Sequence, residues 1–174
     1  MADPSLRRHA ERAAAEGHWI GNHSFSHGPS LGDYADADAA VADVRRAQAL
    51  IGDLAHPDRL FRPYANSGVL DHRVLSRRVV EFLQAERYTL VLWNALPRDW
   101  QTPKWVEIAL KQCADRDWSL MLLHDADGRS IPGLERFLPL ARAAGVEFRQ
   151  EFPSECVPLE RGILKQPLDR LIAG

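Results

Sequence analysis

Two histidines four residues apart, His23 and His27, have the residue type and spacing that could bind a metal ion. They follow a short apolar run at 18–20 and precede Gly28 and Pro29, which predicts a strand end that passes into a loop or a single helical turn. On such a turn both imidazoles lie on one side, close enough to share one metal ion. The alternative is a pair of polar loop histidines that bind no metal.

Polar residues also follow or end three later apolar runs, at 59–61, 88–93 and 118–123. The three clusters are Arg62-Pro63-Tyr64, Asp99-Trp100 and Leu122-Leu123-His124. Open α/β sheets and βα barrels place their active sites at the carboxyl ends of strands. We therefore expect these clusters and the histidine pair to meet at one edge of a sheet.

Each cluster also has a structural interpretation when it is taken singly. His124 and Asp99 could be a buried pair without a catalytic role, since buried polar groups generally have partners. Trp100 and Leu122 could be core residues, and Arg62 could be a surface cation. Only their joint position after successive strands favours the functional interpretation.

Helix and strand patterns alternate along the chain, which predicts an α/β fold with a parallel sheet or barrel. The expected helices are 3–16, 36–53, 70–86, 102–115 and 132–144, and the expected strands are 18–22, 59–61, 88–93, 118–123 and 146–149. A domain over 1–152 would contain all of them. The proline-punctuated segment 153–174 is expected to be an irregular tail.

Composition excludes several classes of protein. The chain has 174 residues, 45% of them hydrophobic, and a net charge of −2, so we expect one domain with a real core and no affinity for nucleic acid. No apolar run approaches a membrane span, and the amino terminus lacks the apolar core of a signal peptide, so we expect no membrane partner and a cytoplasmic location. Cys113 and Cys156 match no zinc spacing and are expected to be ordinary thiols, although a disulfide stays open.

Taken in order, these motifs resemble those of the polysaccharide deacetylase family, the NodB-homology domains of carbohydrate esterase family 4, over about 16–152. The segment 23–27 is similar to the family's metal-binding His-Ser/Thr-x-x-His, and 62–64 resembles Arg-x-Pro-Tyr. Asp99-Trp100 resembles the end of Asp-x-x-Asp-Trp, and 122–124 resembles Leu-x-His. The resemblance implies a (β/α) barrel of the deacetylase type.

The resemblance also implies a divalent metal, usually zinc, held by His23, His27 and an aspartate. Such a metal polarises the acetamide carbonyl of an N-acetylated carbohydrate and lowers the pKa of its bound water to about 7. A second aspartate would accept the proton of that water.

Further roles follow from the resemblance for residues after the later strands. His124 would protonate the leaving amine, and Asp99 would orient His124 and support its positive charge. The backbone N–H of Tyr64 would help to bind the oxyanion. Trp100 and Leu122 would form the walls of the acetyl pocket.

The family's Thr-Phe-Asp-Asp-Gly strand end, which carries both aspartates, is missing from this sequence. We therefore expect an incomplete barrel that lacks the first strand–helix–strand unit, roughly 30 residues or more. Two histidines are one protein ligand fewer than a catalytic zinc normally has, so we expect weak metal binding and little hydrolysis. Asp33 and Asp125 are candidate substitutes, but strand alternation would aim Asp125 away from His124.

Smaller departures indicate a divergent subfamily. Leu96 replaces the first aspartate of the Asp-x-x-Asp-Trp motif, and Ala65 replaces the usual glycine after the tyrosine. Arg62, which by resemblance would hold the catalytic base, adjoins Pro63 one residue closer than in the family pattern. The loss of strands should also expose a sheet edge, which predicts self-association.

Three functions remain open at this point. The first is a metal-dependent deacetylase acting on N-acetylated saccharides. The second is a catalytically dead module that still binds carbohydrate. The third is an amidohydrolase of the same fold acting on a small non-sugar amide.

Overall fold

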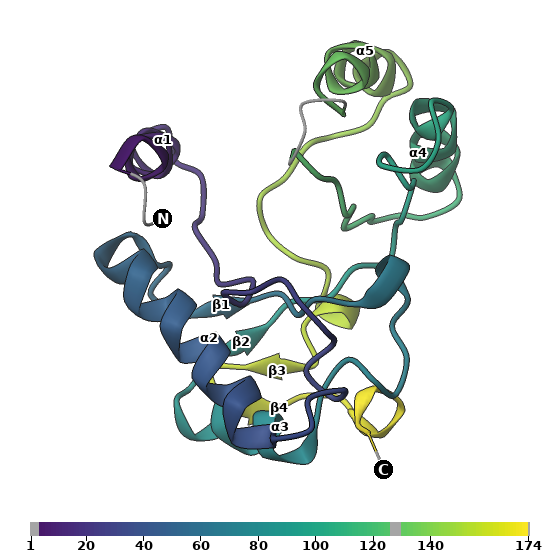
Figure 1. Ribbon diagram of the computed structural model, residues 1–174. Helices are drawn as coiled ribbons and strands as arrows, with labels where there is room; N and C mark the ends of the chain where they lie inside the picture. The colour runs from purple at the N-terminus through teal and green to yellow at the C-terminus, as the bar shows by residue number, and fades with distance from the viewer. Residues whose placement is uncertain (1–3, 126–129, 174) are drawn as a thin grey trace. The chain divides into compact units, whose positions relative to one another are not determined.

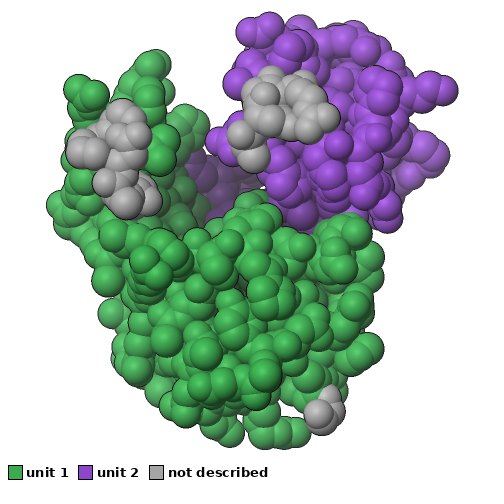
Figure 2. Space-filling model, viewed as in Figure 1, with its two compact units in different colours: residues 1–91, 157–174 green, residues 92–156 purple. Residues whose placement is uncertain are grey.

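The computed structural model describes residues 4–125 and 130–173, which form two compact units (Figure 1; Figure 2). Unit 1 joins Met1–Val91 to Val157–Gly174, and unit 2 is Leu92–Cys156. Asp3, the expected start of the first helix, lies outside the described residues. Within the described ranges, no helix is both long enough and apolar enough to cross a membrane.

Unit 1 contains both helices and strands. Its α-helices and strands are α1 (Pro4–Ala15), α2 (Ala37–Ile51), β1 (Leu60–Phe61), α3 (Arg77–Ala85), β2 (Thr89–Leu90), β3 (Leu159–Glu160) and β4 (Ile163–Leu164). Short 3-10 helices occupy Gly52–Leu54, Asn66–Gly68 and Asp169–Leu171.

Helices α2 and α3 pack against each other through apolar faces at helical spacing. The buried residues are Ala40, Val41, Val44, Ala47 and Ile51 on α2, and Val79, Val80, Phe82 and Leu83 on α3. Asp36 caps α2 by accepting the N–H of Asp38, and Ser76 caps α3 by accepting that of Val79. Each fully buried valine or leucine stabilises the fold by about 1.5–3 kcal/mol.

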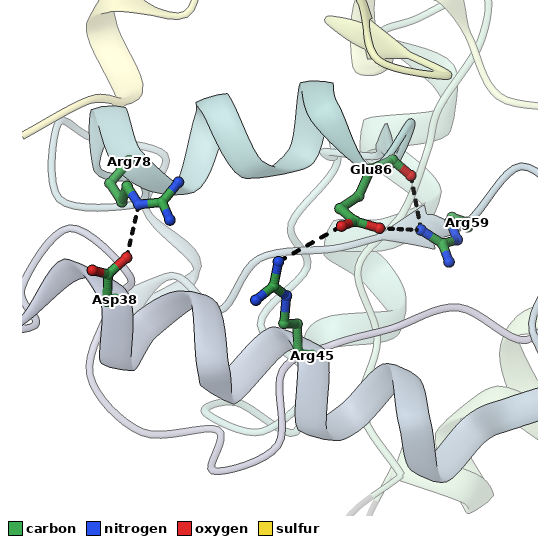
Figure 3. Close-up of polar contacts among 5 residues, drawn as sticks. All are labelled: Asp38, Arg45, Arg59, Arg78 and Glu86. Carbon is green, nitrogen blue, oxygen red and sulfur yellow. Dashed lines mark hydrogen bonds and ion pairs between the residues drawn. The ribbon is translucent and has the colours of Figure 1, made fainter.

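Polar contacts link the exposed rims of these two helices (Figure 3). Arg78 of α3 lies 2.7 Å from Asp38 of α2, and Glu86 lies 3.6 Å from Arg45. Glu86 also accepts a hydrogen bond from Arg59 at 2.9 Å. Because exposed ion pairs contribute only about 0–1 kcal/mol each, apolar packing rather than these pairs holds the helices together.

The sheet is mixed, with the order β1-β2-β3-β4. Strands β1 and β2 run parallel, with Phe61 beside Leu90, and α3 provides the crossover that a parallel pair requires. Strand β3 pairs antiparallel with β2, and β4 pairs antiparallel with β3. The expectation of an α/β fold is confirmed, whereas the expectation of a parallel sheet is wrong for β3 and β4.

The segment 153–174 is not the irregular tail that we predicted. Residues 159–164 form a hairpin whose two-residue turn, Arg161-Gly162, has φ values of 48° and 82°. Both values are positive, as the favoured type I′ hairpin turn requires. Leu159 and Leu171 are fully buried, so this segment completes the core of unit 1. Where the domain suggested by the resemblance ends stays a prediction.

Strand β4 lies at one edge of the sheet and presents apolar side chains to solvent. Ile163 is 62% exposed and Leu164 is 49% exposed. Self-association through an exposed sheet edge stays a prediction.

Two expected elements of unit 1 are shorter than the sequence indicated. The expected strand 18–22 is reduced to single parallel bridges at Ile20 and Asn22. The expected helix 70–86 begins only at Arg77, because the backbone of Leu75 instead exchanges hydrogen bonds with Leu171 and Ala173. Apolar periodicity predicted a helix there, but pairing with the distant C-terminal segment prevails.

Unit 2 is built on two helices, α4 (Trp105–Ala114) and α5 (Ser130–Ala143). Their core consists of Trp105, Val106, Ala109, Phe137 and Ala141. A side chain at Gly133 would lie 2.5 Å from the Trp105 ring, so only glycine permits this close helix contact.

The expected strands of unit 2 are reduced to a single bridge. Met121 pairs in parallel with Ala95, and this bridge replaces the expected strand 118–123. Residues 146–149 form no strand in the described chain. Leu122 is 5% exposed, but Trp118 and Phe148 are 43% and 45% exposed. The apolar runs of unit 2 therefore indicated neither regular strand pairing nor full burial.

Candidate active site

The segment that carries His23 and His27 is tied to α2 by a buried asparagine. The Asn22 side chain donates to the Val44 carbonyl at 2.9 Å and to Gln48 at 3.2 Å, and accepts the Ser24 N–H at 2.9 Å. Asn22 is 2% exposed, so these bonds form away from water. The first turn of the histidine loop is thereby fixed.

Asp43, on the face of α2 near this loop, holds the next turn. Its carboxylate accepts the backbone N–H of Phe25 at 3.0 Å and that of Ser26 at 3.2 Å. His27 itself has a φ of 46°, in the left-handed region, which histidine enters more readily than most residues. The loop is therefore held at its start and at its centre.

The two histidine rings lie side by side. Their centroids are 5.0 Å apart and their planes make an angle of 78°. His23 Nδ1 lies 2.6 Å from the carbonyl oxygen of Arg62. Because a carbonyl only accepts hydrogen bonds, Nδ1 carries the proton, and the lone pair of a neutral His23 ring is on Nε2.

This arrangement fits the binding of a divalent metal by His23 and His27. Histidines that bind metal generally donate the other ring N–H to a carbonyl or carboxylate, as His23 does. In the part of the chain that the structure describes, no three or more His, Cys, Asp or Glu side chains are grouped to hold a metal ion. Asp33, considered above as a substitute ligand, is exposed and joins no such group there.

Arg62 and Tyr64 lie beside the histidine pair. Arg62 contacts His23 through its backbone carbonyl, a role that its side-chain type did not indicate. The Tyr64 ring packs on His27 with its centroid 4.7 Å away and the planes at 65°. The predicted roles of Arg62 near a base and of the Tyr64 N–H at an oxyanion stay predictions.

A second polar cluster lies within unit 2 and centres on Asp99. Its side chain is fully buried and accepts three hydrogen bonds from residues that the structure describes. Oδ1 lies 3.0 Å from His124 Nδ1, and Oδ2 accepts the backbone N–H of His124 at 2.7 Å. Ser130, at the start of α5, donates its hydroxyl to Oδ2 at 2.6 Å.

This pairing fixes the orientation of the His124 ring. Since the Asp99 carboxylate is an acceptor, His124 Nδ1 carries a proton and Nε2 is the atom that can exchange one. The His124 side chain is 29% exposed, which leaves it open to solvent or a ligand. A buried carboxylate behind a part-exposed imidazole is an arrangement suited to general acid–base chemistry.

Of the other predicted residues of unit 2, Trp100 contacts His124 and Leu122 is buried. Trp100 packs edge-on against His124, with ring centroids 4.4 Å apart, whereas Leu122 is 5% exposed. The bridge between Ala95 and Met121 aligns the two segments that carry Asp99 and His124. Asp125 is exposed.

Sequence reasoning missed two residues that support these clusters, Asp43 and Ser130. Asp43 gave no signal beyond its place in an amphipathic helix. Ser130 opens α5, where a hydroxyl is common, but its contact with Asp99 spans 31 residues of sequence.

No protein-family model matches this chain. Several solved structures are similar to it. A T48 deacetylase with substrate is 26% identical, with a TM-score of 0.59, over 78% of this chain and 63% of that chain. The polysaccharide deacetylase Bc1974 from Bacillus cereus is 22% identical, with a TM-score of 0.62, over 88% of this chain and 78% of that chain.

A third similar structure is BA3943 from Bacillus anthracis, a CE4 family pseudoenzyme. It is 16% identical, with a TM-score of 0.61, over 80% of this chain and 47% of that chain. This chain thus spans less than two thirds of the T48 deacetylase and about half of the pseudoenzyme. The chain has the fold of the polysaccharide deacetylases of carbohydrate esterase family 4 and is similar to them.

Proposed function

We propose that this chain is a metal-dependent, deacetylase-like hydrolase that removes acetyl groups from N-acetylated saccharides. The observation that carries the proposal is the side-by-side placement of His23 and His27, with His23 Nδ1 fixed by a carbonyl at 2.6 Å. The similarity to the T48 deacetylase supports the reaction class.

His23 and His27 would hold the metal through ring nitrogens that the loop already brings together. Zinc is the ion of choice because imidazole suits it and it has no redox chemistry. When bound, it would supply an activated water and polarise the acetamide carbonyl. With two protein ligands rather than three, binding should be weak.

His124 would act as the general acid in this proposal. The buried Asp99 carboxylate fixes the ring through Nδ1. From Nε2, the ring would deliver a proton to the leaving amine. Trp100, packed against the His124 ring, would keep water from one side of it.

An incomplete deacetylase barrel is part of the same proposal. The short strands and the 63% coverage of the T48 deacetylase support it. In a complete barrel, a further strand–helix–strand unit would supply the aspartates that the motif comparison requires.

A carbohydrate-binding module without catalysis is the second candidate. The described residues group no third metal ligand with the histidines, and one similar structure is a pseudoenzyme. In that case, the pairing of Asp99 with His124 would serve the structure of unit 2 alone.

Acetate release distinguishes these candidates. Wild-type protein, His124→Ala and the exposed-histidine control His18→Ala would be incubated with zinc and N-acetylglucosamine oligomers, and separately with a small linear amide. The hydrolase proposal predicts acetate from the oligomers with wild type and the control, and at least about a hundredfold less with His124→Ala. Oligomer binding by calorimetry without acetate release would favour the binding module. If neither oligomer binding nor acetate release is detected, both candidates are contradicted.

A further inference from the structure

A basic pocket lies within unit 1 at the end of the sheet where strands β1 and β2 begin. Residues 57–59 precede β1 and residues 85–87 precede β2, and the two strands are parallel. Arg161 is in the turn after β3. Because β3 runs antiparallel to β2, the end of β3 lies beside the start of β2. This open pocket has a volume of about 500 Å³. It lies at the opposite end of β1 from Arg62, which follows the strand and contacts His23.

Three arginines in this pocket share an unusual backbone conformation. Arg59, Arg87 and Arg161 have φ values of 48°, 58° and 48°. Glycine adopts such left-handed values with less strain than arginine does. Arginine nevertheless occupies all three positions.

Backbone hydrogen bonds hold each of these arginines in place. The Arg59 N–H donates to His56 at 2.8 Å, and the Arg87 N–H donates to Gln84 at 3.1 Å. The Arg161 N–H donates to the Thr89 hydroxyl at 3.0 Å. The three guanidinium groups therefore project from a fixed frame.

Carboxylates neutralise only part of this positive charge. Arg59 donates to Glu86 at 2.9 Å, and Arg161 pairs with Asp58 at 2.8 Å. Within the described residues, no carboxylate forms an ion pair with Arg87 that would balance the third guanidinium. Arg45 also lies 3.6 Å from Glu86, so that carboxylate is shared between two arginines (Figure 3).

We propose that this pocket binds a phosphate-type oxyanion, with Arg87 as its principal ligand and Arg161 as the second. Guanidinium groups bind tetrahedral oxyanions through paired N–H donors, and their charge persists at every physiological pH. The anion would add the negative charge that Asp58 and Glu86 do not supply. The phosphate could be free or carried on a sugar, and both forms present the same oxygens.

The test is a titration followed by NMR or calorimetry. The ionic strength is held constant by lowering the chloride concentration as the phosphate ligand is added. Inorganic phosphate and glucose 6-phosphate would be titrated into wild type, Arg87→Gln, Arg161→Gln and Arg78→Gln. Arg78 is the matched control, because it is exposed on α3 and pairs with Asp38 outside the pocket (Figure 3). Thermal melting of each variant would establish that it is folded.

We expect saturable binding by wild type and Arg78→Gln, and about tenfold weaker binding by Arg87→Gln and Arg161→Gln. Tighter binding of glucose 6-phosphate would identify a sugar-borne phosphate, and equal or weaker binding would identify the free anion. Absence of saturation with both ligands, or an equal loss in Arg78→Gln, would overturn the proposal. The result is independent of the proposed hydrolase, since His23→Ala should leave phosphate binding unchanged.

Discussion

Asp99 contacts His124 at two points, through the ring Nδ1 at 3.0 Å and the backbone N–H at 2.7 Å. The carboxylate therefore fixes both the position of the main chain and the orientation of the imidazole. Ser130 occupies a further acceptor site of the same carboxylate. His124 is therefore held in one orientation, unlike an isolated surface histidine.

Replacement of Asp99 by asparagine should disturb this pair without changing its size. The side-chain amide of Asp99→Asn would have one acceptor oxygen for three donors, so a donor would be left unsatisfied at a cost of about 1–3 kcal/mol. We expect changed ¹⁵N shifts of the His124 ring and at least about a hundredfold loss of any acetate release. Asp117→Asn, at an exposed position in the same unit, is the control. Unchanged ring shifts in Asp99→Asn would contradict the assigned role.

Burial raises the pKa of the Cys156 thiol to about 11, and nearby Glu155 adds to the shift. The pKa of an unfolded thiol is about 8.5. Above that pH the thiol of the unfolded chain is ionised, while the thiol of the folded chain still holds its proton. The free energy of unfolding should therefore fall as the pH rises from about 8.5 toward 11.

Urea unfolding at several pH values in this window checks the prediction. Cys156→Ala should show a shallower decline than wild type, whatever its stability at neutral pH. Burial also raises the pKa values of Cys113 and Tyr88, so part of the decline should persist in the variant. Identical slopes for both proteins would show that Cys156 does not titrate as described.

The sequence predicted the α/β class and the clusters that lie after apolar runs, because both depend on local patterns. It placed His23 beside His27 and Asp99 beside His124, and the structure brings each pair together. It did not predict the bond from Ser130 to Asp99, since that contact depends on how α5 packs.

The C-terminal hairpin shows why part of the fold was missed. Prolines at 153, 158 and 167 indicated an irregular segment. The turn residues Arg161-Gly162 stand between two short strands, β3 and β4. Arginine rarely adopts the positive φ that this turn requires, so the sequence did not indicate a turn there. Pairing with β2, some seventy residues earlier, stabilises this hairpin and is invisible to local patterns.

Gly162→Ala tests whether that hairpin belongs to the core of unit 1. An added Cβ would clash with the Gln84 carbonyl oxygen, and the φ of 82° would be strained for alanine. We expect a loss of about 2–4 kcal/mol in the free energy of unfolding, from backbone strain and the clash together. Gly52→Ala is the matched control, because Gly52 also has a positive φ but nothing within 4 Å of the added Cβ. Equal losses in the two variants would mean that the close contact with Gln84 is absent in solution.

The most direct test of the central claim is zinc binding measured by competition with a chromophoric chelator. Wild-type protein should bind one zinc ion, and His23→Ala and His27→Ala should each lose at least about tenfold in affinity. His72→Ala, which removes an exposed histidine from the same unit, should bind zinc as wild type does. Zinc affinity that is the same in His23→Ala and wild type would contradict the claim that these two histidines form a metal site.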